Sequence, residues 1–170
     1  IVCCLDENEN LLDVVLSALS ALKSCTHILA NKTPDVFLSS IPILVKNVLQ
    51  NYTIAPACLQ CIASIILETG PSFLPVLNDV IIAVLEISKK NDVAKEADLF
   101  VAILGVFEAI VEKLGGFLSP YLDEILDFLL LRQSSSESTS KMTEKFESVQ
   151  KSLPKMIPVC VEGDLYFPSR

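Results

Sequence analysis

Histidine, glycine and basic residues are scarce in this sequence, and each shortage excludes a class of function. His27 is the single histidine, so a Ser-His-Asp or Cys-His arrangement could be built only around it, and its neighbours form no nucleophile motif. With five glycines, the chain contains neither a G-x-x-x-x-G-K-[ST] phosphate loop nor a G-x-G-x-x-G dinucleotide loop. We therefore expect no enzyme, no cofactor and no small-molecule substrate.

The scarcity of positive charge argues against nucleic acid as a direct partner. Thirteen Lys and Arg residues face 21 Asp and Glu residues, which gives a net charge of −8 and a pI near 4.6. An acidic chain of this kind repels phosphate backbones. We expect no direct nucleic-acid contact from this segment.

Long uninterrupted hydrophobic runs are also missing, although 51% of the residues are hydrophobic and the mean hydropathy is +0.53. A membrane span needs about 20 predominantly apolar residues, and charged or polar residues interrupt each long apolar stretch. The sequence predicts no membrane partner and a soluble protein whose apolar faces are buried against each other. The chain begins with Ile1 and shows no signal-peptide pattern, so we expect it to be a piece of a longer protein.

One phrase, by contrast, occurs three times. Residues 36–49 read VFLSSIPILVKNVL, residues 70–85 read GPSFLPVLNDVIIAVL, and residues 115–131 read GGFLSPYLDEILDFLLL. Each copy has Phe-Leu, a nearby Pro, and apolar residues 8, 11 and 12 positions after the Phe, which share one helical face. A Pro fits the first turn of a helix, where its missing N–H would have no partner. The three prolines are Pro42, Pro75 and Pro120.

A second apolar helix is predicted before each copy, at about 11–30, 55–69 and 96–114. Gly70 and the pair at 115–116 stand where these helices should end, because a left-handed turn costs least for Gly. The phrases repeat with periods of 36 and 44 residues, measured between their Phe residues. Two helices at such a period are typical of HEAT or armadillo repeats, whose stacked copies bury a continuous core. The alternative is an irregular helical bundle.

We therefore predict an all-α, HEAT/armadillo-like α-solenoid of about three helical hairpins plus a C-terminal helix. The expected division is an N-terminal extension (1–10), three HEAT-like repeats (11–133), a Ser-rich loop (134–140), an additional helix (141–158) and an irregular tail (159–170). The helices at both ends are apolar on one side, so the isolated chain should expose hydrophobic surface and self-associate.

Two cysteines form a C-x-x-C, Cys58 and Cys61, which could ligate zinc or act as a redox dithiol. Structural zinc needs four ligands in most sites, and the other Cys residues are scattered without a finger-like spacing. A thioredoxin-like motif needs a βαβ context, which is not predicted. We interpret both as reduced, buried fillers of the second upstream helix, with a thiol or zinc protein as the alternative. Six Cys residues without a pairing pattern indicate an intracellular protein.

Carboxylates gather at the outward positions of the second and third phrases. We expect them to form an acidic stripe on the concave side of the solenoid and to attract Lys- and Arg-rich segments of partner proteins. Ordinary solvated charge is the alternative interpretation. The candidate partner-binding residues are Asp79, Glu86, Asp123, Glu124 and Asp127.

The segment VEKLGGFLSPYLDEILDFLLL, followed by KFESVQKSLPKMIPV, resembles the family of very large HEAT-repeat scaffolds of the small-subunit processome, the HEAT repeat-containing protein 1 family. This resemblance implies a nucleolar scaffold without catalytic residues, in ribosome biogenesis and pre-ribosomal RNA processing. The basic segments expected to bind the acidic stripe would then belong to ribosome-assembly factors. The family continues with Arg where this chain has Cys160. A HEAT-repeat transport or coat adaptor is the alternative.

Overall fold

The computed structural model describes residues 12–90 and 97–133, except for the side chains of residue 119 and residues 129–133. Within these two ranges the regular structure is entirely helical and no strand occurs. The predicted all-α class is therefore confirmed. The elements in chain order are α1 (Leu12–Leu29), α2 (Pro34–Leu38), α3 (Ile41–Gln50), α4 (Ala55–Thr69), η3 (Gly70–Phe73), α5 (Leu74–Ser88), α6 (Ala97–Leu114), η5 (Gly115–Phe117), η6 (Ser119–Tyr121) and α7 (Leu122–Gln133).

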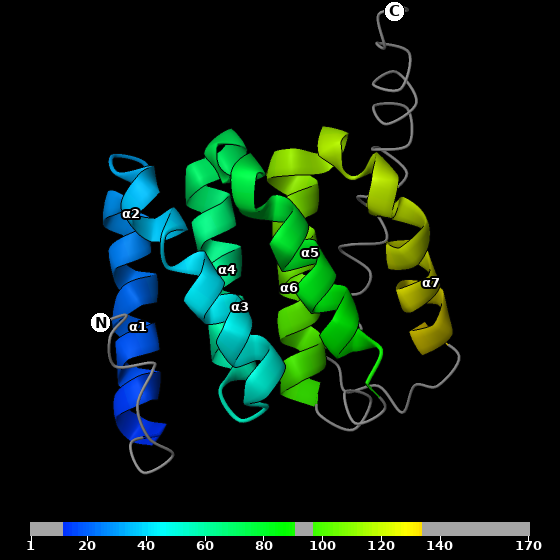
Figure 1. Cartoon of the computed structure of the whole chain (residues 1–170), viewed down its shortest axis with the longest axis horizontal. Coiled ribbons are helices and arrows are strands. Elements are labelled where there is room, and N and C mark those ends of the chain that lie inside the picture. The colour runs from blue at the N-terminus through cyan, green and yellow to red at the C-terminus, as the bar shows by residue number, and fades with distance from the viewer. Residues whose placement is uncertain (1–11, 91–96, 134–170) are drawn as a thin grey trace, which may run out of the picture.

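The helices form two layers (Figure 1). One layer holds α1, α4 and α6 side by side. The other holds α3 and α5, which cross in front of it, and α7, which lies beyond α6 and contacts α5. Helix α4 packs against both α1 and α6, whereas α3 contacts α4 and α5, and α5 contacts α6 and α7. The layer of α1, α4 and α6 contains the three predicted upstream helices, whose observed ends agree with the predicted ones to within a residue.

The same apolar pattern explains why each helix of the first layer forms and where it packs. Four positions with successive spacings of 4, 3 and 4 residues are buried in all three helices, and this spacing places them on one face. The buried positions are Val15, Leu19, Leu22 and Thr26 in α1, Ala55, Leu59, Ile62 and Ile66 in α4, and Leu99, Ile103, Val106 and Ile110 in α6.

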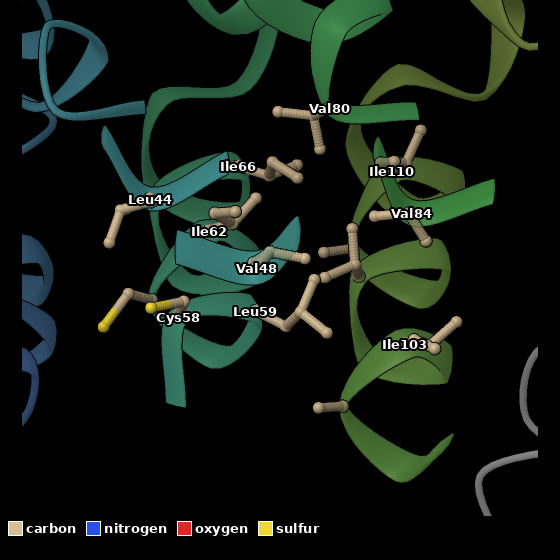
Figure 2. Packing of buried hydrophobic residues seen from close by; sticks show 14 of the residues in the cluster. Leu44, Val48, Cys58, Leu59, Ile62, Ile66, Val80, Val84, Ile103 and Ile110 are labelled. Atoms are coloured by element: carbon tan, nitrogen blue, oxygen red, sulfur yellow. The ribbon is translucent and has the colours of Figure 1, made fainter. Parts of the chain in front are cut away.

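The second layer covers this face of α4 and α6 with β-branched and Leu side chains. Figure 2 shows Leu44 and Val48 of α3 beside the buried residues of α4, and Val80 and Val84 of α5 beside those of α6. Val80 and Val84 lie 36 residues after Leu44 and Val48, so the period read from the sequence is also the period of the packing. One continuous core runs between the layers.

The turns between the layers agree only in part with the helix ends and left-handed turns predicted at glycine residues. Gly70 follows α4 with a φ of 50°, a left-handed conformation that favours glycine. The prediction of a left-handed turn at Gly115 and Gly116 is wrong: α6 ends at Leu114, but Gly70 is the only positive-φ glycine of the described residues, and a 3-10 turn follows α6 instead.

The third phrase departs from the other two. Pro42 and Pro75 lie in the first turns of α3 and α5, as predicted, whereas Pro120 lies in the 3-10 turn η6 and α7 begins two residues later, at Leu122. Phe117 is 54% exposed, although its counterparts in the first two copies are buried. Phe128 of α7 anchors this part of the chain instead, with its ring 5.7 Å from that of Phe100 and 5.8 Å from that of Phe107.

The predicted extension at 1–10, Ser-rich loop at 134–140, helix at 141–158 and tail at 159–170 all lie outside the described residues. Within the described residues, Leu12–Leu29 and Ala55–Ser88 are long and apolar enough to cross a membrane by length and composition. Core helices of soluble proteins meet the same criteria. The second stretch consists of two helices, α4 and α5, joined through Gly70, and half of the residues in its most apolar part are buried. In α1, 22% of the residues of this stretch are buried.

Candidate functional site

The structure places the predicted carboxylates on the solvent side of two neighbouring helices of the second layer. Helices α5 and α7 contact each other, and every predicted carboxylate on them is exposed. The acidic surface defined in this way consists of Asp79 and Glu86 on α5 and Asp123, Glu124 and Asp127 on α7.

One of these carboxylates has a cationic partner within the chain. The ammonium Nζ of Lys89, which follows α5, lies 3.1 Å from Oε2 of Glu124 on α7. Both side chains are more than half exposed, so solvent screens the pair and it contributes little to stability. A second polar contact joins η6, the turn before α7, to α5, since the Tyr121 hydroxyl donates a hydrogen bond to Oδ1 of Asn78. These two contacts connect α5 with α7 and with the turn that precedes it.

The local sequence suits negative charge at the start of α7. Asp123 and Glu124 lie in its first turn, where the positive end of the helix dipole stabilises carboxylates. Asp123 and Asp127 are four residues apart and therefore adjacent on the helix surface, where like charges repel. The acidic surface thus holds closely spaced negative charge that a basic partner would neutralise.

An exposed isoleucine, which the sequence reasoning did not single out, belongs to the same surface. Ile82 of α5 is 52% exposed, and it lies three residues after Asp79 and four residues before Glu86. Residues at these spacings are neighbours on one helix face. The sequence signal was available: Ile82 lies nine residues after the Phe of its phrase, outside the apolar positions 8, 11 and 12 that the three copies share.

The C-x-x-C lies in α4, and both side chains are buried. The Cys61 thiol donates a hydrogen bond to the carbonyl oxygen of Leu19 in α1, with Sγ 3.2 Å from O. Burial raises the pKa of Cys58 to about 12, with a further increase from neighbouring Cys61, and burial raises the pKa of Cys61 to about 11, partly offset by Lys23.

Because the thiolate is the nucleophile, these raised pKa values disfavour nucleophilic thiol chemistry at neutral pH. In the described ranges, no group of three or more His, Cys, Asp or Glu residues is placed to hold a metal ion. The predicted interpretation, reduced and buried fillers of α4, agrees with the observed burial and with the free state of both thiols.

Polar bridges tie α1 to α4 along the outer face of the first layer. His27 Nδ1 lies 2.9 Å from Oε1 of Glu68, and the ammonium of Lys23 donates to Oε1 of Gln60 at 3.5 Å. The exposed imidazole contacts a carboxylate of the neighbouring helix, which links α1 to α4.

A groove of about 330 Å³ lies between α4 and α6 on this outer face, and the sequence reasoning did not find it. Small residues of α6, at spacings of three and four, leave this space: Ala102, Gly105 and Ala109. Lys23, Glu108 and Glu112 stand among the lining residues, so its charge is mixed. The groove therefore offers less electrostatic selectivity than the acidic surface.

Comparisons with known proteins show a partial similarity to a plant protein. No family model and no solved structure matches the chain. A protein from Arabidopsis thaliana that is described as uncharacterized is 30% identical over 91 residues, which covers 48% of this chain and 4% of that relative. The chain is thus similar to a small part of a far longer protein.

Proposed function

We propose that this chain is a HEAT-type α-solenoid segment that acts as a non-catalytic protein-interaction scaffold in small-subunit ribosome biogenesis. The acidic surface on α5 and α7 is the working surface, and Lys- and Arg-rich segments of assembly proteins are its partners. The observation that carries the proposal is the combination of five exposed carboxylates with an exposed isoleucine on two adjoining helices.

The geometry supports this proposal in two ways. The repeated buried positions of α1, α4 and α6, with α3 packed on α4 and α5 packed on α6, resemble the stacking of a helical-repeat protein. Ile82 would supply apolar contact at the centre of a charged surface, and the surrounding carboxylates would raise the association rate and select a basic partner. The partner segment should therefore place an apolar side chain between basic residues.

The biological setting is proposed from the sequence resemblance, and the long Arabidopsis relative is compatible with a large scaffold protein. A transport or coat adaptor built from the same repeats would also use exposed helix surfaces. A tagged copy of the chain should co-sediment with precursors of the small ribosomal subunit and localise to the nucleolus. Exclusive association with vesicle coats or with transport cargo would replace the ribosomal assignment by the adaptor one.

A matched pair of triple variants tests the surface itself. The first variant removes three charges from the acidic surface and leaves the Lys89–Glu124 pair intact. It changes Asp79, Asp123 and Asp127 to Asn. The control variant changes three exposed Asp residues elsewhere to Asn, and these are Asp13, Asp35 and Asp98. Both variants change the net charge of the chain equally, so an effect of net charge alone would weaken peptide binding by both variants to the same extent.

The probe is a synthetic peptide of alternating Lys and Leu, titrated by isothermal calorimetry at low and moderate salt. We expect the surface variant to bind at least about tenfold more weakly at low salt and to lose salt dependence, because ionic attraction is screened by salt. The control should bind like wild type. Equal affinity of all three proteins would assign these carboxylates to ordinary solvated charge.

A further inference from the structure

The groove between α4 and α6 has the size of a small binding site. Its volume is about 330 Å³, and residues of α4 and α6 form most of its lining. Helix α4 stands between α1 and α6 (Figure 1), and Lys23 of α1 also lines the groove. Pockets that hold small ligands have volumes of roughly 300–1,000 Å³. The space therefore suits one long side chain or a small molecule rather than a whole helix.

The apolar lining of the groove includes three small residues of α6. Gly105 is in the interior of this helix, where a glycine lowers stability relative to an alanine. Ala102 and Ala109 lie on the same side of α6, three residues before Gly105 and four residues after it. No side chain longer than a methyl group stands at these three positions. An aliphatic chain can therefore lie close to the backbone of α6.

The charged groups of the groove are separated by sign. Glu108 and Glu112 line it from α6, and they are neighbours on the helix surface because they are four residues apart. Lys23 belongs to the other side, since its ammonium donates a hydrogen bond to Oε1 of Gln60 on α4. The exposed ion pair of Glu112 with adjacent Lys113, 3.0 Å between Oε1 and Nζ, is screened by solvent. A cation is therefore attracted to the α6 side of the groove, where two like charges lie close together.

An arginine side chain matches this arrangement better than a lysine side chain. The guanidinium is a planar fork with five N–H donors, so it can bridge two carboxylates that stand side by side. The aliphatic stem of arginine packs on apolar surface while its charged head stays among polar groups. A lysine ammonium carries the same charge on a single nitrogen and cannot form this fork.

We propose that the groove is a binding site for one Arg side chain of a partner segment. The stem lies along the three small residues of α6, and the guanidinium binds the carboxylates of Glu108 and Glu112. Lys23, on the opposite side, favours backbone carbonyl groups of the segment over further basic side chains. The site belongs to helices of the first layer, so it is separate from the acidic surface on α5 and α7 and does not depend on it.

The test follows the backbone amide of Gly105 by nuclear magnetic resonance, in the full chain labelled with isotope-enriched glycine. The chain has five glycines, so the signals are few, and Gly105→Ala identifies the relevant one by its loss. The probe is a short peptide with blocked ends and one central Arg among Gly and Ser. A control peptide carries citrulline, which keeps the shape of the side chain and removes its charge. We expect the Arg peptide to shift the Gly105 signal to saturation and the citrulline peptide to leave it in place.

Two matched double variants test the carboxylates. Glu108→Gln with Glu112→Gln should weaken binding of the Arg peptide by at least about tenfold, because the charge-assisted hydrogen bonds are lost. Glu86→Gln with Glu124→Gln makes the same chemical change on the acidic surface, and it should leave binding at the groove like wild type. Ala63→Leu narrows the groove from α4 and should weaken binding to a similar extent. Circular dichroism melts establish that the variants fold.

An Arg peptide that leaves the Gly105 signal unmoved would overturn the proposal. Equal affinity of the wild-type chain and the Glu108, Glu112 double variant would overturn it as well, since the carboxylates would then have no part in binding. A citrulline peptide that binds as tightly as the Arg peptide would contradict the selection for positive charge. The readout is a glycine of the groove itself, so a failure of the acidic surface to bind basic segments would not change these results.

Discussion

The ammonium of Lys89 and the carboxylate of Glu124 lie 3.1 Å apart and connect the end of α5 to the first turn of α7. This contact separates Glu124 from the other carboxylates of the acidic surface, because its charge is already partly compensated within the chain. A partner that binds the acidic surface would have to compete with Lys89 at this position. Asp79, Asp123 and Asp127 are for this reason the sharper targets for a binding test.

The Lys89–Glu124 pair should contribute little to folding stability. A double-mutant cycle with Lys89→Ala and Glu124→Ala should give a coupling energy below about 1 kcal/mol, since both groups are solvated and salt screens them. Urea denaturation of the four proteins measures it. A coupling well above that bound would mean that the contact holds α7 in place by itself.

Two Ile residues, one buried in α4 and one exposed on α5, test which faces of these helices point into the core. Ile66→Ala in α4 should lower the free energy of unfolding by about 2–5 kcal/mol, because it leaves a cavity at a fully buried position. Ile82→Ala makes the same chemical change at a half-exposed position of α5, and it should stay within about 0.5 kcal/mol of wild type. Equal losses for both variants in denaturant titrations would contradict the described packing.

The buried thiols should make the protein less stable at high pH. The pKa values of Cys58 and Cys61 are raised from 9.0 to about 12 and about 11 in the folded chain. Above pH 9 the unfolded chain therefore releases protons that the folded chain retains, so stability falls as pH rises from about 9 toward 11. The slope is about 1.4 kcal/mol per pH unit for each thiol.

The measurement compares urea unfolding at several pH values for the wild-type chain and a Cys58→Ala, Cys61→Ala double variant. Lys and Tyr titrate alike in both proteins, so the difference isolates the thiols. We expect the variant to show a flatter dependence between pH 8 and 10. Parallel curves would mean that the thiols ionise equally in the folded and unfolded chains. A thiol reagent should also modify half-buried Cys25 before the two buried thiols.

The left-handed backbone of Gly70 should make it intolerant of a side chain. Gly70→Ala should cost about 1–2 kcal/mol, because its φ of 50° strains an L-residue. A Cβ at this position would meet no atom within 4 Å, so the expected cost is purely conformational. Gly116→Ala, at an exposed position whose φ is not left-handed, is the matched control and should change stability by less than about 0.5 kcal/mol. Thermal melts that rank the two variants in the opposite order would refute this account.

The sequence by itself determined the helices and their order in this protein. Apolar spacing of three and four residues makes α1, α4 and α6 amphipathic whatever they pack against, so their ends could be read to within a residue. The outward position of Asp79, Glu86 and the acidic residues of α7 followed from the same periodicity. Burial of Cys58 followed from its apolar neighbours on α4.

Only the tertiary structure decided which helix faces meet, because side chains distant in the chain must be brought together before their contacts exist. The Lys89–Glu124 pair joins residues 35 positions apart, and the Cys61–Leu19 hydrogen bond joins residues 42 positions apart. Phe117 matched the repeated phrase, yet packing placed Phe128 between the α6 rings and left Phe117 in solvent. Periodicity identifies an apolar face, and packing alone determines its partner.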